Sequence, residues 1–164
     1  MRSILVFAAF VLALAVIAPR LMSRHDAASM TAVAEPSQPA ANSRSVAISR
    51  GQNGHFQTDG VVDGRRLGFL VDTGASVIAL REGDAARLGI HPSQREFTLR
   101  VNTANGVILA APVELNRVEV GDVTVRNVAG LVLPDEALAQ NLLGMSFLSR
   151  VHWQYEGGKL VLEQ

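Results

Sequence analysis

Short apolar runs separated by turn residues fill the chain from about residue 44 to residue 164. Two of the breaks are Asp63-Gly64 and Asn105-Gly106, and such dipeptides are typical of two-residue β-hairpin turns. The runs recur about every ten residues, as in small barrels and sandwiches. Short helices are expected at Glu82–Leu88, which Gly89 ends, and at Gly144–Leu148. The pattern predicts an all-β barrel or sandwich with one or two short helices.

The apolar runs also predict where individual strands lie. We expect strands at 46–48, 56–62, 65–71, 77–80, 97–103, 107–115, 118–120, 123–133, 151–155 and 160–162. Residues 134–143 are expected to form a loop with one helical turn.

An uncharged apolar run occupies residues 4–18, between Arg2 and Arg20. About fifteen apolar residues are few for a full membrane span and resemble the core of a signal peptide. Residues 16–18 fit a signal-cleavage pattern, but Pro19 directly after them opposes cleavage. We therefore favour an uncleaved anchor and keep a cleaved signal as the alternative.

The composition divides the chain into three parts. Residues 1–22 are the expected signal-anchor or transmembrane segment, with membrane contact through 4–22. Residues 23–43 are rich in Ala, Ser and Pro and predict a disordered linker. Residues 44–164 form the expected folded domain. The single lysine, Lys159, among 15 basic residues hints at a GC-rich bacterial genome. The expected location is thus the bacterial inner membrane, single-pass, with the domain in the periplasm, or released there after cleavage.

The candidate for chemistry is an acid that directly follows an apolar strand. Asp72 comes after residues 69–71 and is followed by Thr73 and Gly74. A carboxylate at the end of a buried strand is unfavourable unless hydrogen bonds compensate for its lost hydration. Thr73 supplies a hydroxyl, and Gly74 lets the backbone turn and approach closely. The ordinary alternative is a solvated turn at a strand end.

Three segments carry a resemblance to a known family. Residues 70–76, Leu-Val-Asp-Thr-Gly-Ala-Ser, resemble the active-site signature of retropepsin-type aspartic proteases. The later segment resembles the family's two-apolars-plus-glycine element, which packs under the catalytic loop: Leu142, Leu143 and Gly144. Between them, where the family has its flap, lies the turn Thr103, Ala104, Asn105 and Gly106. With the apolar N-terminus, the chain is most similar to membrane-anchored bacterial retropepsin-like aspartic proteases, which implies a closed retropepsin-like barrel.

The resemblance implies a role for each of these segments. Asp72 is the implied catalytic residue, and the implied support of the active-site loop comes from Thr73, Gly74, Ala75 and Ser76. The chain has one Asp-Thr-Gly where the chemistry needs two paired carboxylates, so a homodimer is expected, with Asp72 from each subunit. Our first expectation for the dimer interface is the segment Val161–Glu163.

Other classes of function find little support in the composition. The formal net charge is zero, which argues against a strongly basic nucleic-acid binder. The chain has no cysteine, and its four histidines are scattered, so neither a metal site nor a cofactor is expected. Trp153 and Tyr155 alternate on a strand and are expected to pack at a sheet edge.

The expected activity is that of an aspartic endopeptidase that hydrolyses peptide bonds of exported or membrane-proximal proteins. A water molecule would be activated between the two Asp72 carboxylates. The expected binding partners of the protein are polypeptide substrates. The alternative is a catalytically silent dimeric peptide-binding module of the same fold. A second alternative is an anchored structural β-domain in which the motif is a coincidence.

Overall fold

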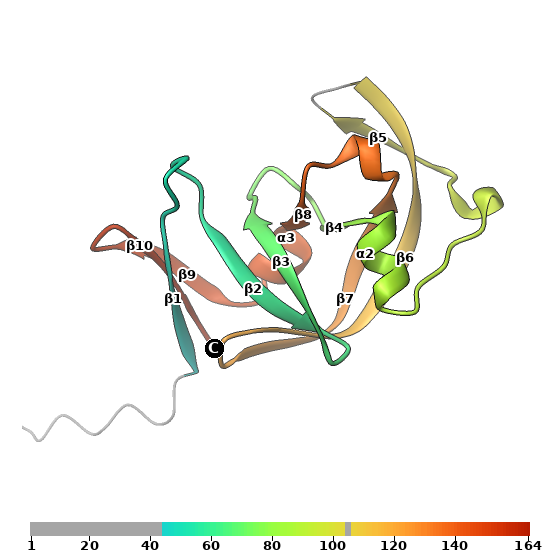
Figure 1. Cartoon of the computed structure of the whole chain (residues 1–164). Coiled ribbons are helices and arrows are strands. Elements are labelled where there is room, and N and C mark those ends of the chain that lie inside the picture. Colours follow the sequence, from blue (N-terminus) through green and yellow to red (C-terminus); the bar gives the residue numbers. More distant parts are fainter. Residues whose placement is uncertain (1–43, 104–105) are drawn as a thin grey trace, which may run out of the picture. The chain divides into compact units, whose positions relative to one another are not determined.

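The structure, a computed structural model, describes residues 44–103 and 106–164 (Figure 1). The expected anchor at 1–22 and linker at 23–43 lie outside the described residues, as do Ala104 and Asn105. Within the described ranges, no helix is both long and apolar enough to cross a membrane.

Ten strands and four short helical segments make up the described part of the chain. The strands are β1 (Ser45–Ser49), β2 (Gln57–Val62), β3 (Arg65–Val71), β4 (Ile78–Arg81), β5 (Leu99–Thr103), β6 (Gly106–Val120), β7 (Val123–Leu133), β8 (Asn141–Leu143), β9 (His152–Glu156) and β10 (Lys159–Glu163). The α-helices are α2 (Glu82–Arg87) and α3 (Met145–Leu148), and the 3-10 helices are η1 (Gln94–Glu96) and η2 (Asp135–Ala137).

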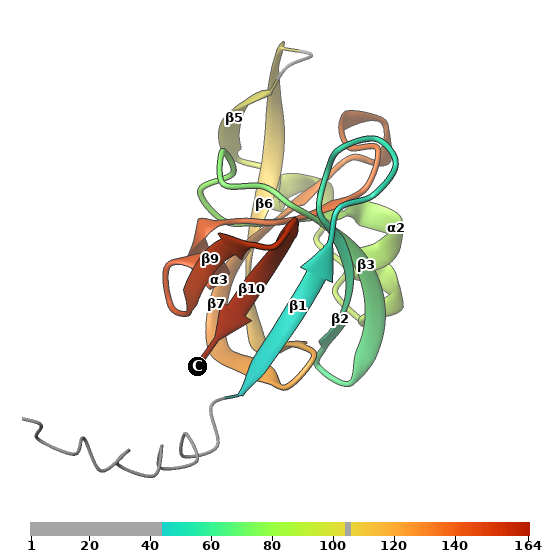
Figure 2. The same cartoon turned by 90° about the vertical axis from the view of Figure 1, so that its left-hand side faces the viewer.

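The larger sheet closes on itself as a barrel. Its strands follow the order β2-β3-β8-β4-β7-β6, and β2 also pairs with β6, which completes the ring. Strand β5 continues the sheet beyond β6, and the β5–β6 hairpin rises above the barrel (Figures 1 and 2). A separate antiparallel sheet has the order β1-β10-β9 and faces the viewer in Figure 2. The expectation of an all-β closed barrel with a few short helices is confirmed.

The hairpin between β2 and β3 follows from its turn residues. Asp63 and Gly64 have φ angles of 48° and 87°, both positive as a type I′ turn requires. The Asp63 carboxylate also accepts the backbone N–H of Arg117 on β6, at 2.9 Å. The turn residues therefore set the hairpin register and tie the turn to β6, the strand that pairs with β2.

Strand β6 is longer than the sequence predicts. It runs without interruption from Gly106 to Val120, where two strands at 107–115 and 118–120 were expected. In the sequence, the polar residues at 116 and 117 interrupt the apolar pattern, as the residues between two separate strands would. They stay in the strand because Arg117 pairs with Arg126 on β7, and Asn116 donates its N–H to Asp63. Pairing with neighbouring strands thus overrides the local polarity.

Strand β8 lies where the sequence predicts a loop. The expected helical turn is present as η2, but Asn141–Leu143 pairs in parallel with β3, from Phe69 to Val71. A three-residue strand has almost no local pattern of its own. Its extended form comes from its place between β3 and β4, which are distant in the sequence.

The barrel interior is filled by apolar side chains from nearly all elements. Among the largest fully buried side chains are Phe69, Ile78, Leu115, Leu143 and Phe147. Every strand finds its pairing partners within residues 44–164, and the main core cluster lies there as well. This part of the chain therefore contains what an independently folding domain needs.

Candidate active site

The loop after β3 holds the candidate catalytic carboxylate. Asp72 follows the last residue of β3, and its backbone N–H donates to the carbonyl oxygen of Leu143 at 3.1 Å. The Gly74 N–H donates to Oδ1 of Asp72 at 2.8 Å, and the Ala75 N–H donates to the Asp72 carbonyl oxygen at 3.3 Å. Asp72 is half-buried. The turn thus fixes the carboxylate with a backbone donor while part of it stays accessible.

The Leu142-Leu143-Gly144 segment lies directly beneath this loop. The N–H of Met145 donates to the carbonyl oxygen of Ala75 at 2.8 Å. A Cβ placed on Gly144 would stand 2.7 Å from the Ala75 oxygen and closer still to the oxygen of Val77. Real Cβ atoms do not come so near, so this position needs glycine. The structure therefore brings together the two motifs that are about seventy residues apart.

Helix α3 anchors the far side of the loop through one hydroxyl. Ser146 Oγ accepts the N–H of Ile78 at 3.0 Å and donates to the carbonyl oxygen of Ala129 at 2.7 Å. One side chain thus joins α3, β4 and β7. This contact holds the end of the loop against the barrel.

A cleft of about 760 Å³ lies between the loop and the β5–β6 hairpin. Asp72 and Arg100 are the charged residues that line it, while most of the lining is apolar. The polar remainder of the lining is Ser76, Asn102 and Thr103, and the apolar part includes Val77, Leu99, Val101, Val113, Leu131, Leu138 and Leu142. A mostly apolar cleft with one carboxylate at its side fits an extended peptide.

The β5–β6 hairpin stands where a flap over the cleft is expected. Leu99, Val107 and Leu109 on this hairpin are each about half exposed, at 47%, 52% and 49%. Near the tip, Thr103 Oγ1 donates to the carbonyl oxygen of Gly106 at 2.8 Å. Gly106 has a φ of +111°, which favours glycine. The other two expected flap residues, Ala104 and Asn105, lie outside the described residues.

Thr73 faces away from the cleft that Asp72 lines. It is exposed and lines a separate cavity of about 280 Å³, together with Trp153 and Tyr155 on β9. Among the described residues, its hydroxyl has no hydrogen-bond partner. The loop therefore presents the carboxylate to the cleft and the threonine to the β1-β10-β9 sheet.

Asn141 is a site-supporting residue that the sequence reasoning missed. It is the buried polar residue of the described core, 2% exposed. Its Oδ1 accepts the N–H of Arg81 at 2.9 Å, and its Nδ2 donates to the oxygens of Gly68 and Asp84 at 3.1 and 2.8 Å. The sequence signal was an amide directly before two leucines. Through these hydrogen bonds the Asn141 side chain joins β3, β4 and α2.

The described residues offer no obvious metal centre. No three His, Cys, Asp or Glu side chains in residues 44–103 and 106–164 come together as metal ligands.

Comparisons with known proteins agree with this geometry. Residues 58–150 match a family described as gag-polyprotein putative aspartyl protease. Two curated relatives are similar: a Sinorhizobium protein from the cobV 5′ region is 47% identical over 104 residues, and Rickettsia prowazekii RP867 is 41% identical over 105 residues. These matches cover 63% and 64% of this chain but 45% of each relative. The chain thus spans about half the length of the curated relatives it matches.

Solved structures extend the likeness to the fold. A retropepsin-like aspartic protease from Rickettsia conorii superposes with a TM-score of 0.65 at 38% identity, covering 74% of this chain and 91% of that one. The EIAV protease in complex with the inhibitor HBY-793 superposes with a TM-score of 0.51 at 16% identity, covering 63% of this chain and 93% of the protease. The second likeness shows the fold alone. From the family match, the shared barrel and the placement of Asp72, the chain belongs to the retropepsin-like aspartyl protease family.

Proposed function

We propose that this chain is an aspartic endopeptidase that works as a homodimer. The observation that carries the proposal is the placement of Asp72, held by the Gly74 N–H at 2.8 Å and facing a largely apolar cleft under the β5–β6 hairpin. A protein that only bound peptides would have no need of a carboxylate held at this point of the cleft. The family to which the chain belongs supports the same activity.

A second subunit is needed because the described site has one carboxylate. Peptide hydrolysis by an aspartic pair uses one ionised and one protonated acid that share a proton. In a symmetric dimer each subunit contributes its Asp72. The ionised carboxylate accepts a proton from the bridging water, whose oxygen attacks the peptide carbonyl carbon. The protonated carboxylic acid donates to the carbonyl oxygen, and a tetrahedral gem-diol forms. Proton transfer to the amide nitrogen then breaks the C–N bond, with no covalent enzyme intermediate.

The strand that we expected at the interface has no free edge. β10, which contains Val161–Glu163, is paired with β1 on one side and with β9 on the other. Its edges therefore cannot accept a strand of a second subunit. The outer edge of β9 is unpaired in the described part of the chain, and every residue of β9 is exposed. We place the dimer contact at this edge instead.

The backbone of β9 is arranged for such pairing. Gly157 and Gly158 have φ angles of 56° and 82°, so a two-residue type I′ turn joins β9 to β10. In that turn the Glu156 carbonyl faces β10. Because backbone groups alternate sides along a strand, the N–H and C=O groups of Trp153 and Tyr155 face outward. These are the groups that a second β9 strand would bind.

The sequence of β9 is complementary to itself in one antiparallel register. With Gln154 on the two-fold axis, Trp153 lies opposite the partner's Tyr155, and His152 lies opposite the partner's Glu156. Aromatic pairs and opposite charges across strands each contribute roughly 0.2–1 kcal/mol. The aromatic residues are 40% and 60% exposed in the single chain, and they share a cavity with Thr73. Pairing at this edge would bring the second subunit next to the active-site loop, where it could supply a partner for the Thr73 hydroxyl.

The location and the substrates are further parts of the proposal. The apolar run at 4–18 supports a membrane anchor, and residues 23–43 supply a tether of about twenty residues with a reach of about 25 Å. We propose an inner-membrane protein whose domain faces the periplasm and cleaves exported or membrane-proximal polypeptides. Anchoring confines both subunits to a thin layer and so favours a weak dimer.

The proposed activity is tested with residues 44–164, wild type beside Asp72→Asn. Each protein is incubated with an unfolded polypeptide at about pH 4 to 7, with and without pepstatin, and products are read by mass spectrometry. We expect cleavage by the wild type alone, blocked by pepstatin, with a rate that rises faster than linearly with enzyme concentration. No cleavage by a wild-type domain that is dimeric in solution would overturn the proposal and favour the peptide-binding alternative.

A further inference from the structure

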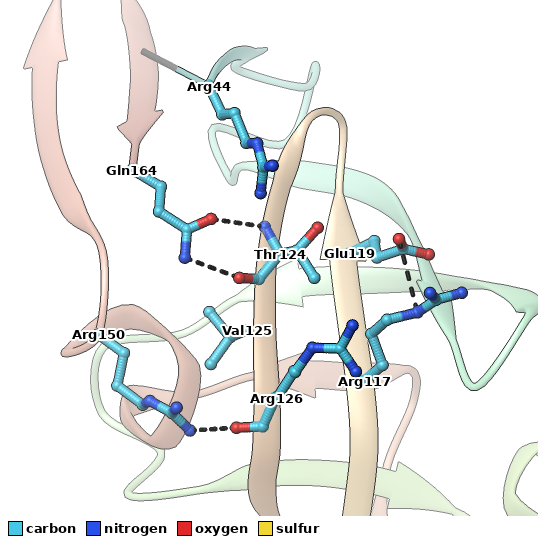
Figure 3. Close-up of a pocket in the computed structure, with 8 residues that line it drawn as sticks. All are labelled: Arg44, Arg117, Glu119, Thr124, Val125, Arg126, Arg150 and Gln164. Atoms are coloured by element: carbon cyan, nitrogen blue, oxygen red, sulfur yellow. Dashed lines mark hydrogen bonds and ion pairs between the residues drawn. The ribbon is translucent and has the colours of Figure 1, made fainter. Parts of the chain in front are cut away.

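A further cavity lies at the opposite end of the barrel from the β5–β6 hairpin. It has a volume of about 560 Å³ and is lined by eight residues. Four of them are arginines, Arg44, Arg117, Arg126 and Arg150, and a single lining side chain, Glu119, is acidic (Figure 3). The whole chain has no net charge, so this concentration of positive charge is local. The cavity shares no lining residue with the Asp72 cleft.

The positive charges of this cavity are poorly balanced within the chain. Arg117 and Arg126 lie directly opposite each other on β6 and β7, and like charges at such positions destabilise a sheet. Glu119 lies 3.6 Å from Nε of Arg117. In the part of the chain that the structure describes, no carboxylate forms an ion pair with Arg44, Arg126 or Arg150. Three of the four arginines thus have no carboxylate partner among the described residues, and such a cluster fits an external anion.

The walls of the cavity are held in place by hydrogen bonds. The Gln164 side chain makes two hydrogen bonds with the backbone of Thr124. Its Oε1 accepts the Thr124 N–H at 3.1 Å, and its Nε2 donates to the Thr124 carbonyl oxygen at 2.8 Å. Arg150 Nη1 donates to the carbonyl oxygen of Arg126 at 2.5 Å (Figure 3) and to the carbonyl oxygen of Asn127 at 3.1 Å. The Arg150 guanidinium is thereby oriented and keeps further N–H groups for a ligand. Guanidinium groups suit phosphate oxygens, because their planar N–H pairs match phosphate geometry.

The position of the cavity indicates where its anion comes from. Arg44 is the first residue of the described domain, and the preceding residues carry the tether and the apolar run. The start of β1, the end of β10 and the β6–β7 turn gather at one end of the domain, and β5 lies at the other end (Figures 1 and 2). Residues 1–43 join the domain at this end, so on the membrane anchor proposed above, on which this step rests, lipid headgroups are the anions nearest to these arginines.

We propose that the arginine cavity binds the phosphate of anionic phospholipid headgroups and docks the domain on the membrane. In this orientation the β5–β6 hairpin points away from the lipid, so the Asp72 cleft receives polypeptides from the aqueous side. The inference goes beyond the proposed function, because it assigns a ligand to a surface that takes no part in catalysis.

The test uses residues 44–164, which lack the apolar run, with vesicles of phosphatidylcholine containing about one-third phosphatidylglycerol. We expect co-sedimentation with these vesicles and not with pure phosphatidylcholine. Each arginine near an anionic surface contributes about a factor of five to the affinity. Arg126→Gln should therefore weaken vesicle binding about fivefold, and the double variant Arg44→Gln with Arg126→Gln about 25-fold. Arg95→Gln is the matched control, because it removes the same charge from η1, away from the cavity.

Two further readouts keep the result interpretable. Arg126→Gln removes the charge opposite Arg117, so its thermal midpoint should equal or exceed that of the wild type, which excludes loss of binding through unfolding. Cleavage of a soluble polypeptide without vesicles should be unchanged in the arginine variants. Loss of vesicle binding can therefore be told apart from loss of the proposed protease activity. The proposal is overturned by absent vesicle binding, by equal loss in Arg95→Gln, or by saturable binding of inorganic phosphate without vesicle binding.

Discussion

Gly144 lies so close to Ala75 that a single methyl group cannot be placed between them. A Cβ on Gly144 would stand 2.7 Å from the Ala75 carbonyl oxygen, which also accepts the N–H of Met145 at 2.8 Å. The obstacle is backbone and not a flexible side chain. The loop that carries Asp72 would have to move before any other residue could occupy position 144.

Gly144→Ala is therefore expected to destabilise the domain and to disturb the active-site loop. We expect a loss of about 3 kcal/mol in the free energy of unfolding, typical of forced overpacking, together with reduced peptide cleavage. Urea unfolding followed by circular dichroism measures the first effect. Gly68→Ala is the control, because a Cβ on Gly68 meets no atom within 4 Å. Equal stability of the two variants would show that the loop does not depend on this contact.

Asn141→Leu tests the buried amide that joins three elements around the site. The change keeps the approximate volume but removes the acceptor for Arg81 N–H and the donor to Gly68 and Asp84. Because buried polar groups are left without partners, we expect about 3 kcal/mol of lost stability. The neighbouring Gln140→Leu is the control, since Gln140 makes one exposed side-chain bond to Gln57. A variant at 141 as stable as the one at 140 would contradict this role for the amide.

The elements that the sequence predicted are those with local signals. The Asp63-Gly64 turn, the apolar run before Asp72 and the glycine at 144 each have a chemical signature over a few residues. Strand β8 and the continuity of β6 had none, because both depend on partners from distant parts of the chain. The same holds for Asn141, whose three bonded neighbours are 57 to 73 residues away. The sequence also did not show that both edges of β10, which contains Val161–Glu163, are paired, because that pairing is a property of the whole sheet.

Gln154→Cys tests the register proposed for the dimer. The chain has no cysteine, so this variant carries one thiol per subunit. On a two-fold axis between antiparallel strands the two α-carbons at 154 would lie about 4.5 Å apart, which a disulfide can span. We expect rapid formation of a covalent dimer under mild oxidation, seen on a non-reducing gel. Arg66→Cys, an exposed position on β3, should remain largely monomeric. An active, dimeric Gln154→Cys variant that does not cross-link would refute the register and leave the activity intact.

Mixing wild-type and Asp72→Asn subunits tests whether two Asp72 carboxylates form one site. Asparagine keeps the shape of aspartate but cannot exchange the proton that the pair must share. At an enzyme concentration where the wild type is fully dimeric, shown by a rate linear in concentration, and with free subunit exchange, an equal amount of Asp72→Asn diverts half of the wild-type subunits into mixed dimers. Cleavage should then fall to about half although the amount of wild type is unchanged. A matched addition of bovine serum albumin controls for competition by added protein. Activity that stays constant would mean that each subunit carries a complete site, and the dimeric mechanism would be wrong.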